Sequence, residues 1–171
     1  LKNYNWDVLI ISGGVGRFFD EEDIKDILEK IKGGKGLIII EPEENNFNSL
    51  ISPVIKKDKL LQKVKWEKKV NNFITDGIPF EILPPTDIYT YKEIKNPDIL
   101  ITGNGQPVLS TTILGEGRIA VFSYKAGTTL KENKPYGLIP LMCDSYYDII
   151  SEFPHFDYHE YFFSLLGKVI L

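Results

Sequence analysis

The sequence predicts an α/β fold: a three-layer sandwich in which helices cover both faces of a mainly parallel sheet, with a late antiparallel hairpin at one edge. Three observations support this. Short runs of branched apolar residues at 7–12 and 37–40 end at glycine or at proline, as buried parallel strands do. A helical apolar stripe separates the two runs. Near position 116, two β-rich segments flank a Gly-Glu-Gly turn, which is typical of a hairpin.

The first unit is predicted to be a right-handed strand–helix–strand crossover. Its first strand covers Asp7–Ser12, and Asp20 is placed to cap the helix that follows. Gly33 and Gly34 end the helix, and the second strand covers Leu37–Ile40. The apolar stripe of the helix consists of Ile24, Ile27, Leu28 and Ile31.

The middle of the chain is less regular. Apolar residues at positions 64, 66 and 70 alternate with lysines, which predicts a half-exposed strand. Residues 78–85 contain three prolines and are expected to form an extended edge segment or a loop. A strand is predicted at 98–102, because its residues are mostly β-branched.

Two further elements end the predicted fold. The hairpin joins Pro107–Leu114 to Arg118–Tyr124 through the glycine turn. Aromatic and aliphatic residues between Tyr158 and Leu171 share one face of a C-terminal helix, which is a core-facing pattern. With 171 residues and no internal linker, the chain is expected to form a single domain.

Composition excludes several functional classes. The net charge is −4 and the isoelectric point is about 5.3, which argues against a nucleic-acid binder. One cysteine cannot form a disulfide framework, and no apolar run reaches the ~20 residues that span a bilayer. Residues 56–69 carry seven lysines against two acids; they could attract phosphates or an acidic partner, or protect an exposed strand edge.

The Gly13–Gly16 turn is a candidate anion or nucleotide site, because it follows a strand and precedes a helix. Gly14 and Gly16 begin a dinucleotide fingerprint, but Phe19 stands at its third small position. Acidic residues at 20–23 would also face a bound pyrophosphate. No cofactor is therefore expected, although Gly13, Gly14 and Gly16 remain candidate ligand-binding residues.

Four segments carry a resemblance to a known family: Asp7–Gly16, Gly34–Ile40, Ile74–Phe80 and Gly115–Tyr124. Together they resemble class I glutamine amidotransferase-like domains of flavodoxin-like fold, in the branch that includes ThuA-like proteins and domains attached to β-galactosidases. The resemblance implies an additional strand and helix before residue 7. It therefore implies that residues 1–171 are one amidotransferase-like domain cut from a longer polypeptide.

The same resemblance locates the candidate catalytic positions. In catalytic members the second strand ends in a nucleophilic cysteine at a sharp elbow, and the late hairpin leads to a catalytic histidine. Those positions fall at or beside Glu41 and near Lys125. Without a cysteine and histidine within reach of each other, glutaminase activity is not expected.

Glu41 and Lys125 have two interpretations. They could meet above the carboxyl ends of the strands and form a ligand pocket or an acid/base pair. Alternatively, each is solvated, or the two form a weak salt bridge. The first interpretation predicts a hydrolase or related enzyme. The second predicts a non-catalytic module for assembly or ligand binding, and the family resemblance implies a link to carbohydrate metabolism.

The remaining candidate residues predict no metal site. His155 and His159 have the i, i+4 spacing of helical metal ligands, but Pro154 places His155 before the helix. Cys143 has no neighbouring cation and is expected to be an inert thiol. Expected partners are the remainder of a larger polypeptide or another subunit, and a carbohydrate ligand, with no nucleic acid and no membrane span. The sequence does not indicate a compartment.

Overall fold

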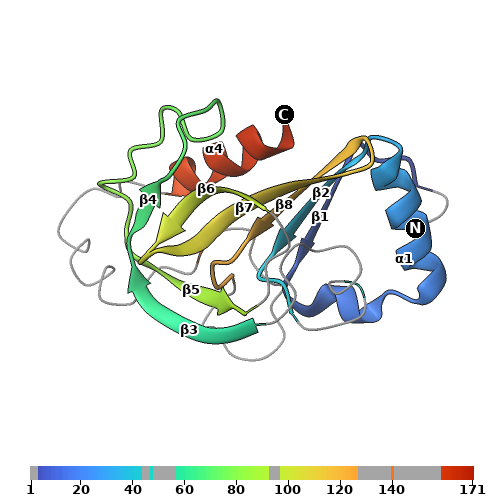
Figure 1. The fold of residues 1–171 in the computed structure, drawn as a ribbon, viewed down its shortest axis with the longest axis horizontal. Coiled ribbons are helices and arrows are strands. Elements are labelled where there is room, and N and C mark those ends of the chain that lie inside the picture. Colours follow the sequence, from blue (N-terminus) through green and yellow to red (C-terminus); the bar gives the residue numbers. More distant parts are fainter. Residues whose placement is uncertain (1–3, 44–46, 48–56, 93–96, 127–139, 141–158) are drawn as a thin grey trace.

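A computed structural model describes residues 4–43, 47, 57–92, 97–126, 140 and 159–171 (Figure 1). Six strands form one sheet in the order β1-β2-β8-β7-β6-β4, and β3 pairs with β5 in a separate two-stranded sheet. The strands are Val8–Ser12 (β1), Gly36–Ile40 (β2), Lys57–Val64 (β3), Trp66–Lys68 (β4), Thr86–Tyr91 (β5), Asp98–Gly103 (β6), Gln106–Leu114 (β7) and Gly117–Phe122 (β8). The helices are a 3-10 helix at Gly13–Phe18 (η1) and α-helices at Glu21–Lys32 (α1) and His159–Ile170 (α4).

The predicted fold class is wrong, because the described part of the molecule is mostly β. Of the five pairings in the large sheet, β1–β2 and β2–β8 are parallel, whereas β8–β7, β7–β6 and β6–β4 are antiparallel. A parallel neighbour requires a long crossover, whereas an antiparallel neighbour requires only a short turn. From β8 outward, consecutive strands β6, β7 and β8 are joined by such turns. The result is a mixed sheet, with one crossover helix described.

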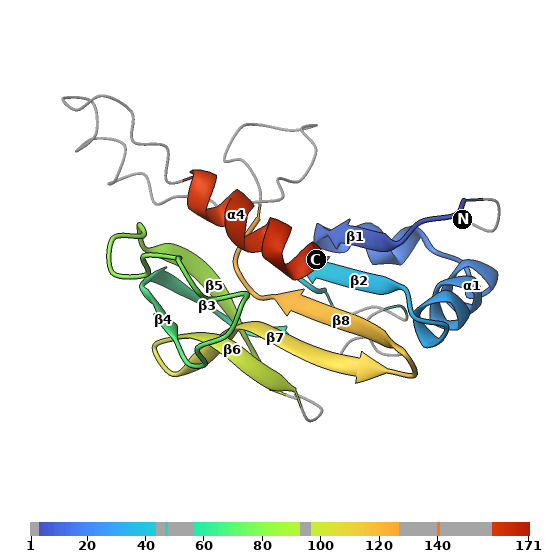
Figure 2. The same ribbon diagram turned by 90° about the horizontal axis from the view of Figure 1, so that it is seen from above.

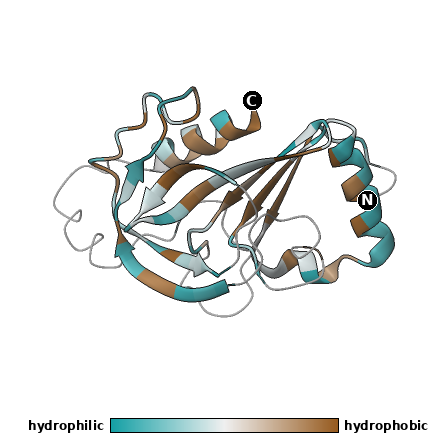
Figure 3. Cartoon of the chain, in the orientation of Figure 1, coloured by the Kyte–Doolittle hydropathy of each residue, from teal (hydrophilic) through white to brown (hydrophobic). Residues whose placement is uncertain are grey.

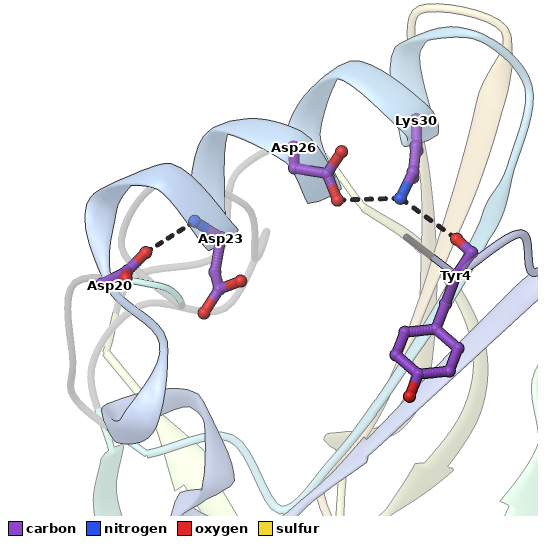
Figure 4. A network of polar contacts seen from close by, with 5 residues as sticks. All are labelled: Tyr4, Asp20, Asp23, Asp26 and Lys30. Atoms are coloured by element: carbon purple, nitrogen blue, oxygen red, sulfur yellow. Dashed lines mark hydrogen bonds and ion pairs between the residues drawn. The ribbon is translucent and has the colours of Figure 1, made fainter. Parts of the chain in front are cut away.

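The β1–α1–β2 unit is confirmed as a parallel crossover. Figure 4 shows the start of α1, where the Asp20 carboxylate accepts a hydrogen bond of 2.8 Å from the Asp23 N–H. In the last turn of the helix, Lys30 lies between Asp26 and the carbonyl oxygen of Tyr4. Gly34 adopts φ +105°, which only glycine tolerates well, and so ends the helix as the sequence indicates.

The large sheet separates two apolar clusters, because successive side chains of a strand point to opposite faces. Leu37 and Ile39 of β2 pack with α1 on one face. Ile38 and Ile40 belong to the cluster that contains α4, which crosses the sheet in Figure 2. Figure 3 shows that β1, β2 and β8 are apolar along most of their length. This is the pattern expected of strands buried on both faces.

The predicted hairpin is confirmed as β7–β8, but its place at one edge of the sheet is wrong. It occupies the centre, because β8 also pairs with β2. A side chain at Gly117 would overlap the carbonyl oxygens of Ile31 and Lys35, so this glycine allows β8 to start against the end of α1. The proline-rich segment 78–85 is a loop of turns, as expected. No pattern in the sequence predicted β5.

Candidate functional site

Glu41 is the residue that directly follows β2 at its carboxyl end. Its backbone has φ +53°, a left-handed conformation that is uncommon for a residue other than glycine. The turn is fixed by the Glu41 N–H, which donates a hydrogen bond of 2.9 Å to the carbonyl oxygen of Phe122 in β8. Such backbone strain costs about 1–3 kcal/mol and is concentrated at functional sites in proteins. The strand therefore ends in a sharp, strained elbow that carries a carboxylate.

The Glu41 side chain is buried, and both of its oxygens have partners. The Lys57 ammonium at the start of β3 lies 3.2 Å from Oε1. The backbone N–H of Ala126, which follows β8 by four residues, donates a hydrogen bond of 2.8 Å to Oε2. Glu41 thus joins three segments that are far apart in the sequence.

Tyr89 of β5 extends this arrangement. The Lys57 ammonium lies 3.5 Å from the centre of the Tyr89 ring, a cation–π contact, while it also pairs with Glu41. The pKa of Tyr89 is raised to about 12, first by burial and then by the charge of Glu41 and a hydrogen bond to it. We call Glu41, Lys57, Tyr89 and Ala126 the Glu41 cluster.

Tyr91, two residues further along β5, lies beside the elbow. Its hydroxyl donates a hydrogen bond of 3.2 Å to the carbonyl oxygen of Pro42. Burial, with the charge of Glu41 as the next cause, raises the pKa of Tyr91 well above its ordinary value. The phenol therefore stays protonated and can fix the backbone immediately after Glu41.

Glu41 contacts the segment that contains Lys125, but a backbone amide of that segment makes the contact and the Lys125 side chain does not. The contact comes from the amide of Ala126, whereas the ammonium paired with Glu41 belongs to Lys57. The amide of Lys125 itself donates a hydrogen bond of 2.8 Å to the carbonyl oxygen of Asp87. A catalytic role for Glu41 and Lys125 stays a prediction. The sequence does not single out Lys57, because it is one of seven lysines between residues 56 and 69.

The glycine turn folds as η1, and a carboxylate of the chain itself lies against it. A Cβ added at Gly14 would overlap Oε2 of Glu43. Glu43 therefore places a negative charge at the position where Gly13, Gly14 and Gly16 were expected to receive an anion. Ligand binding by these glycines stays a prediction, and an incoming anion would meet this charge.

A groove of about 1120 Å³ lies at the other end of the parallel strands. Its floor includes Val8, Ile38 and Ala120, which belong to the three parallel strands β1, β2 and β8. Its walls include residues 70 and 72–74, the last three residues of α4 and Leu171, which follows that helix. The groove is thus formed mainly by apolar side chains at the amino ends of these strands, away from Glu41.

The mouth of the groove carries an exposed ion pair. Lys35 lies 2.8 Å from the carboxylate of Asp7, which lines the groove. The hydrogen bond from Lys35 and its positive charge lower the pKa of Asp7. Since the Asp7 side chain is exposed, this ion pair places charges at the mouth of the groove without closing it.

Other predicted site residues give less information. His155 and Cys143 lie outside the described residues, and His159 is the first residue of α4. Among the residues that the structure describes, no three His, Cys, Asp or Glu side chains gather as metal ligands would. None of the described helices is both long enough and apolar enough to cross a membrane.

Comparison with known proteins finds structures of similar fold but does not place the chain in a family. Neither the protein-family models nor the curated proteins include a match. Among solved structures, the chain is similar to the cytoplasmic protein STM3548 from Salmonella typhimurium, with 19% identity and a TM-score of 0.54 over 69% of this chain and 60% of that one. It is also similar to a cold-adapted β-galactosidase from Rahnella sp. R3, with 12% identity and a TM-score of 0.55 over 95% of this chain and 22% of that one.

A β-galactosidase from Bacillus circulans sp. alkalophilus is similar as well, with 8% identity and a TM-score of 0.51 over 69% of this chain and 20% of that one. The chain therefore spans less than two thirds of the length of these proteins. At such low identity the similarity concerns the fold, since one fold serves many functions.

Proposed function

We propose that this chain is a non-catalytic, glutamine amidotransferase-like module that serves assembly or ligand binding in a larger, carbohydrate-related protein. The observation that carries the proposal is the state of Glu41. Both carboxylate oxygens at the candidate nucleophile position have partners within the protein, the Lys57 ammonium and the Ala126 amide.

This arrangement disfavours catalysis by Glu41. A nucleophile or general base must present a free oxygen to a substrate within hydrogen-bonding distance. Here the Lys57 ammonium and the Ala126 amide contact the two oxygens, and the side chain is buried. The Glu41 cluster instead ties β2 to β3, β5 and the segment after β8. Its role is therefore structural.

Two further observations support the family and the context. The strained elbow at Glu41 lies where the resemblance implies a sharp turn after the second strand. The β-galactosidases of similar fold are much longer than this chain, which corresponds to about a fifth of each. The resemblance and these proteins together favour a carbohydrate-related context.

The test is an activity measurement on the 171-residue chain and on its Glu41→Gln variant. Nitrophenyl galactosides, nitrophenyl esters and glutamine serve as probes, and Lys35→Met is the control variant at the other end of the strands. We expect no turnover above buffer for any of the three proteins. Hydrolysis of a probe by the chain, with a loss of about 100-fold or more in a folded Glu41→Gln variant, would overturn the proposal.

A further inference from the structure

The charges of this chain are concentrated in two segments of opposite sign. Residues 56–69 contain seven lysines and two acids, whereas residues 20–29 contain six acids and one lysine. Strands β3 and β4, which carry most of these lysines, lie at one end of the longest axis of the molecule in Figure 1, and α1 lies at the other end. The folded molecule therefore has a basic end and an acidic end.

The basic end presents lysines that lack a carboxylate partner. Of the two acids in this run, Asp58 already forms an ion pair of 3.1 Å with Lys92, and Glu67 lies among the lysines on β4. Lys57 is paired with Glu41. Four other lysines are exposed, and none of them forms an ion pair with any residue that the structure describes: Lys59, Lys63, Lys65 and Lys69. We call these four lysines the basic surface.

The acidic end is the side of α1 that faces water. The opposite side of this helix carries Ile24, Ile27 and Ile31, which are buried, as in any amphipathic helix on a protein surface. Three glutamates are exposed, and we call them the acidic surface: Glu21, Glu22 and Glu29. Within the described ranges of the chain, Glu21 and Glu29 form no ion pair. These two charges are therefore available to a basic partner.

The basic and acidic surfaces cannot neutralise each other within one molecule. They lie at opposite ends of its longest axis (Figure 1). Exposed charges that are separated by more than a Debye length of ~8 Å at physiological salt are largely screened from each other. A second copy removes this restriction, because its acidic surface can approach the basic surface of the first. Complementary charges of this kind orient two proteins and speed their encounter.

We propose that the basic surface binds the acidic surface of a second copy of this chain. This inference rests on the proposed function, because it names the partner for the assembly role. The contact joins unlike surfaces, so repeated contacts either close into a ring or continue as an open chain. Exposed ion pairs are individually weak, so the association is weak and depends strongly on salt.

Sedimentation equilibrium at two salt concentrations tests the inference. With about 0.5 mM protein, we expect the association constant to fall by about tenfold or more between about 20 mM and about 300 mM sodium chloride. A protein that is monomeric under both conditions would overturn the inference and leave the proposed function standing. Association of equal strength under both conditions would also overturn it, because charge would then not be its cause.

Charge reversal at each end locates the contact. The basic-end variant combines Lys65→Glu with Lys69→Glu, and the acidic-end variant combines Glu21→Lys with Glu29→Lys. Each variant alone should associate about tenfold more weakly than the parent chain, because its two surfaces then carry like charges. Unchanged association of either variant would overturn the inference.

A mixture of the two variants separates loss of the contact from loss of the fold. The acidic-end variant keeps the basic surface, and the basic-end variant keeps the acidic surface. We expect the mixture at low salt to associate within about threefold of the parent chain, which unfolded variants would not do. A mixture that stays monomeric would contradict the proposed contact.

The matched control combines Glu81→Lys with Glu160→Lys. Both residues are exposed, and the change in net charge equals that of the acidic-end variant. This control should not weaken the association. Weakening equal to that of the acidic-end variant would show that net charge alone is responsible, and would overturn the inference.

Other partners give distinct results. Binding of anionic phospholipid vesicles, or of a DNA duplex, by a protein that stays monomeric would assign the basic surface to another partner and overturn the inference. Turnover of a nitrophenyl probe would instead overturn the proposed function, without changing the salt dependence expected of the association.

Discussion

The two ends of the β1–β2 pair each carry one lysine–carboxylate ion pair, in very different surroundings. At the amino end, Lys35 and Asp7 are 2.8 Å apart, and their side chains are 30% and 96% exposed. At the carboxyl end, Lys57 and Glu41 are 3.2 Å apart, with side chains only 23% and 8% exposed. The shorter contact is thus the one in water.

This difference indicates that burial, more than the distance between the charged atoms, decides how much an ion pair contributes to stability. An exposed pair is screened by water and contributes little. When a buried pair loses one partner, it leaves a charge that water cannot reach, so each partner becomes necessary. At the carboxyl ends of the strands, the interactions of Glu41 hold neighbouring segments together. At the amino ends, the exposed ion pair leaves the groove open.

The largest expected effect comes from removing each lysine in turn. Lys57→Met should lower the free energy of unfolding by about 2–4 kcal/mol, because the buried Glu41 carboxylate loses its ammonium partner. Lys35→Met should leave the free energy of unfolding unchanged within error. Urea denaturation of both variants makes the comparison, and the double variant with Glu41→Gln should recover part of the loss. Equal losses at the two ends would contradict the role assigned to burial.

Two glycines should give the opposite order, with the larger loss of stability at the amino ends of the strands. Gly117→Ala, near the amino ends, should lower the free energy of unfolding by about 1–3 kcal/mol, because the new methyl group would meet backbone carbonyls of Ile31 and Lys35. Gly14→Ala, near the carboxyl ends, meets the flexible end of Glu43 and should cost less than about 1 kcal/mol. Thermal unfolding of the two variants would contradict this order if Gly14→Ala had the lower midpoint.

The smallest effect is a change in the titration of one phenol. Tyr89 should titrate with a pKa of about 12, and Glu41→Gln should move that pKa down toward 10 without reaching it, since burial is the first cause of the shift. The folded chain holds this proton more tightly than the unfolded chain does, so stability is full below pH 10 and declines as the pH rises toward 12. Ring-labelled tyrosine NMR, with Tyr89→Phe for assignment, makes the measurement.

Local sequence patterns predicted the elements whose partners are close in the chain. The α1 helix, its Asp20 cap and the β7–β8 hairpin follow from spacing and from glycine positions. The same patterns failed for the sheet as a whole. A run of branched apolar residues indicates a buried strand but not the direction of its neighbour, so β8 could not be assigned as the strand that lies between β2 and β7.

The candidate site shows the same limit. The family resemblance identified Glu41 from local sequence alone, because the residue directly follows the predicted strand at 37–40. Lys57 and Tyr89 reach Glu41 because β3 pairs with β5. The register of this pairing shifts twice, and no sequence pattern predicted β5. A one-residue change in that register would replace Lys57 beside Glu41 by a neighbouring residue of the run, such as Asp58. No spacing rule within the lysine run contains that information.

The central place of β8 has a consequence for the time at which this sheet can form. Gly36 of β2 pairs with Arg118 of β8, roughly eighty residues later in the chain. At the usual ~5–20 residues per second, a ribosome needs several seconds to reach β8 after it has made β2. During that interval β1 and β2 can pair with each other while β2 has no partner on its other side. A newly made chain therefore passes through a state with apolar strands exposed, in which a chaperone would find its binding surface.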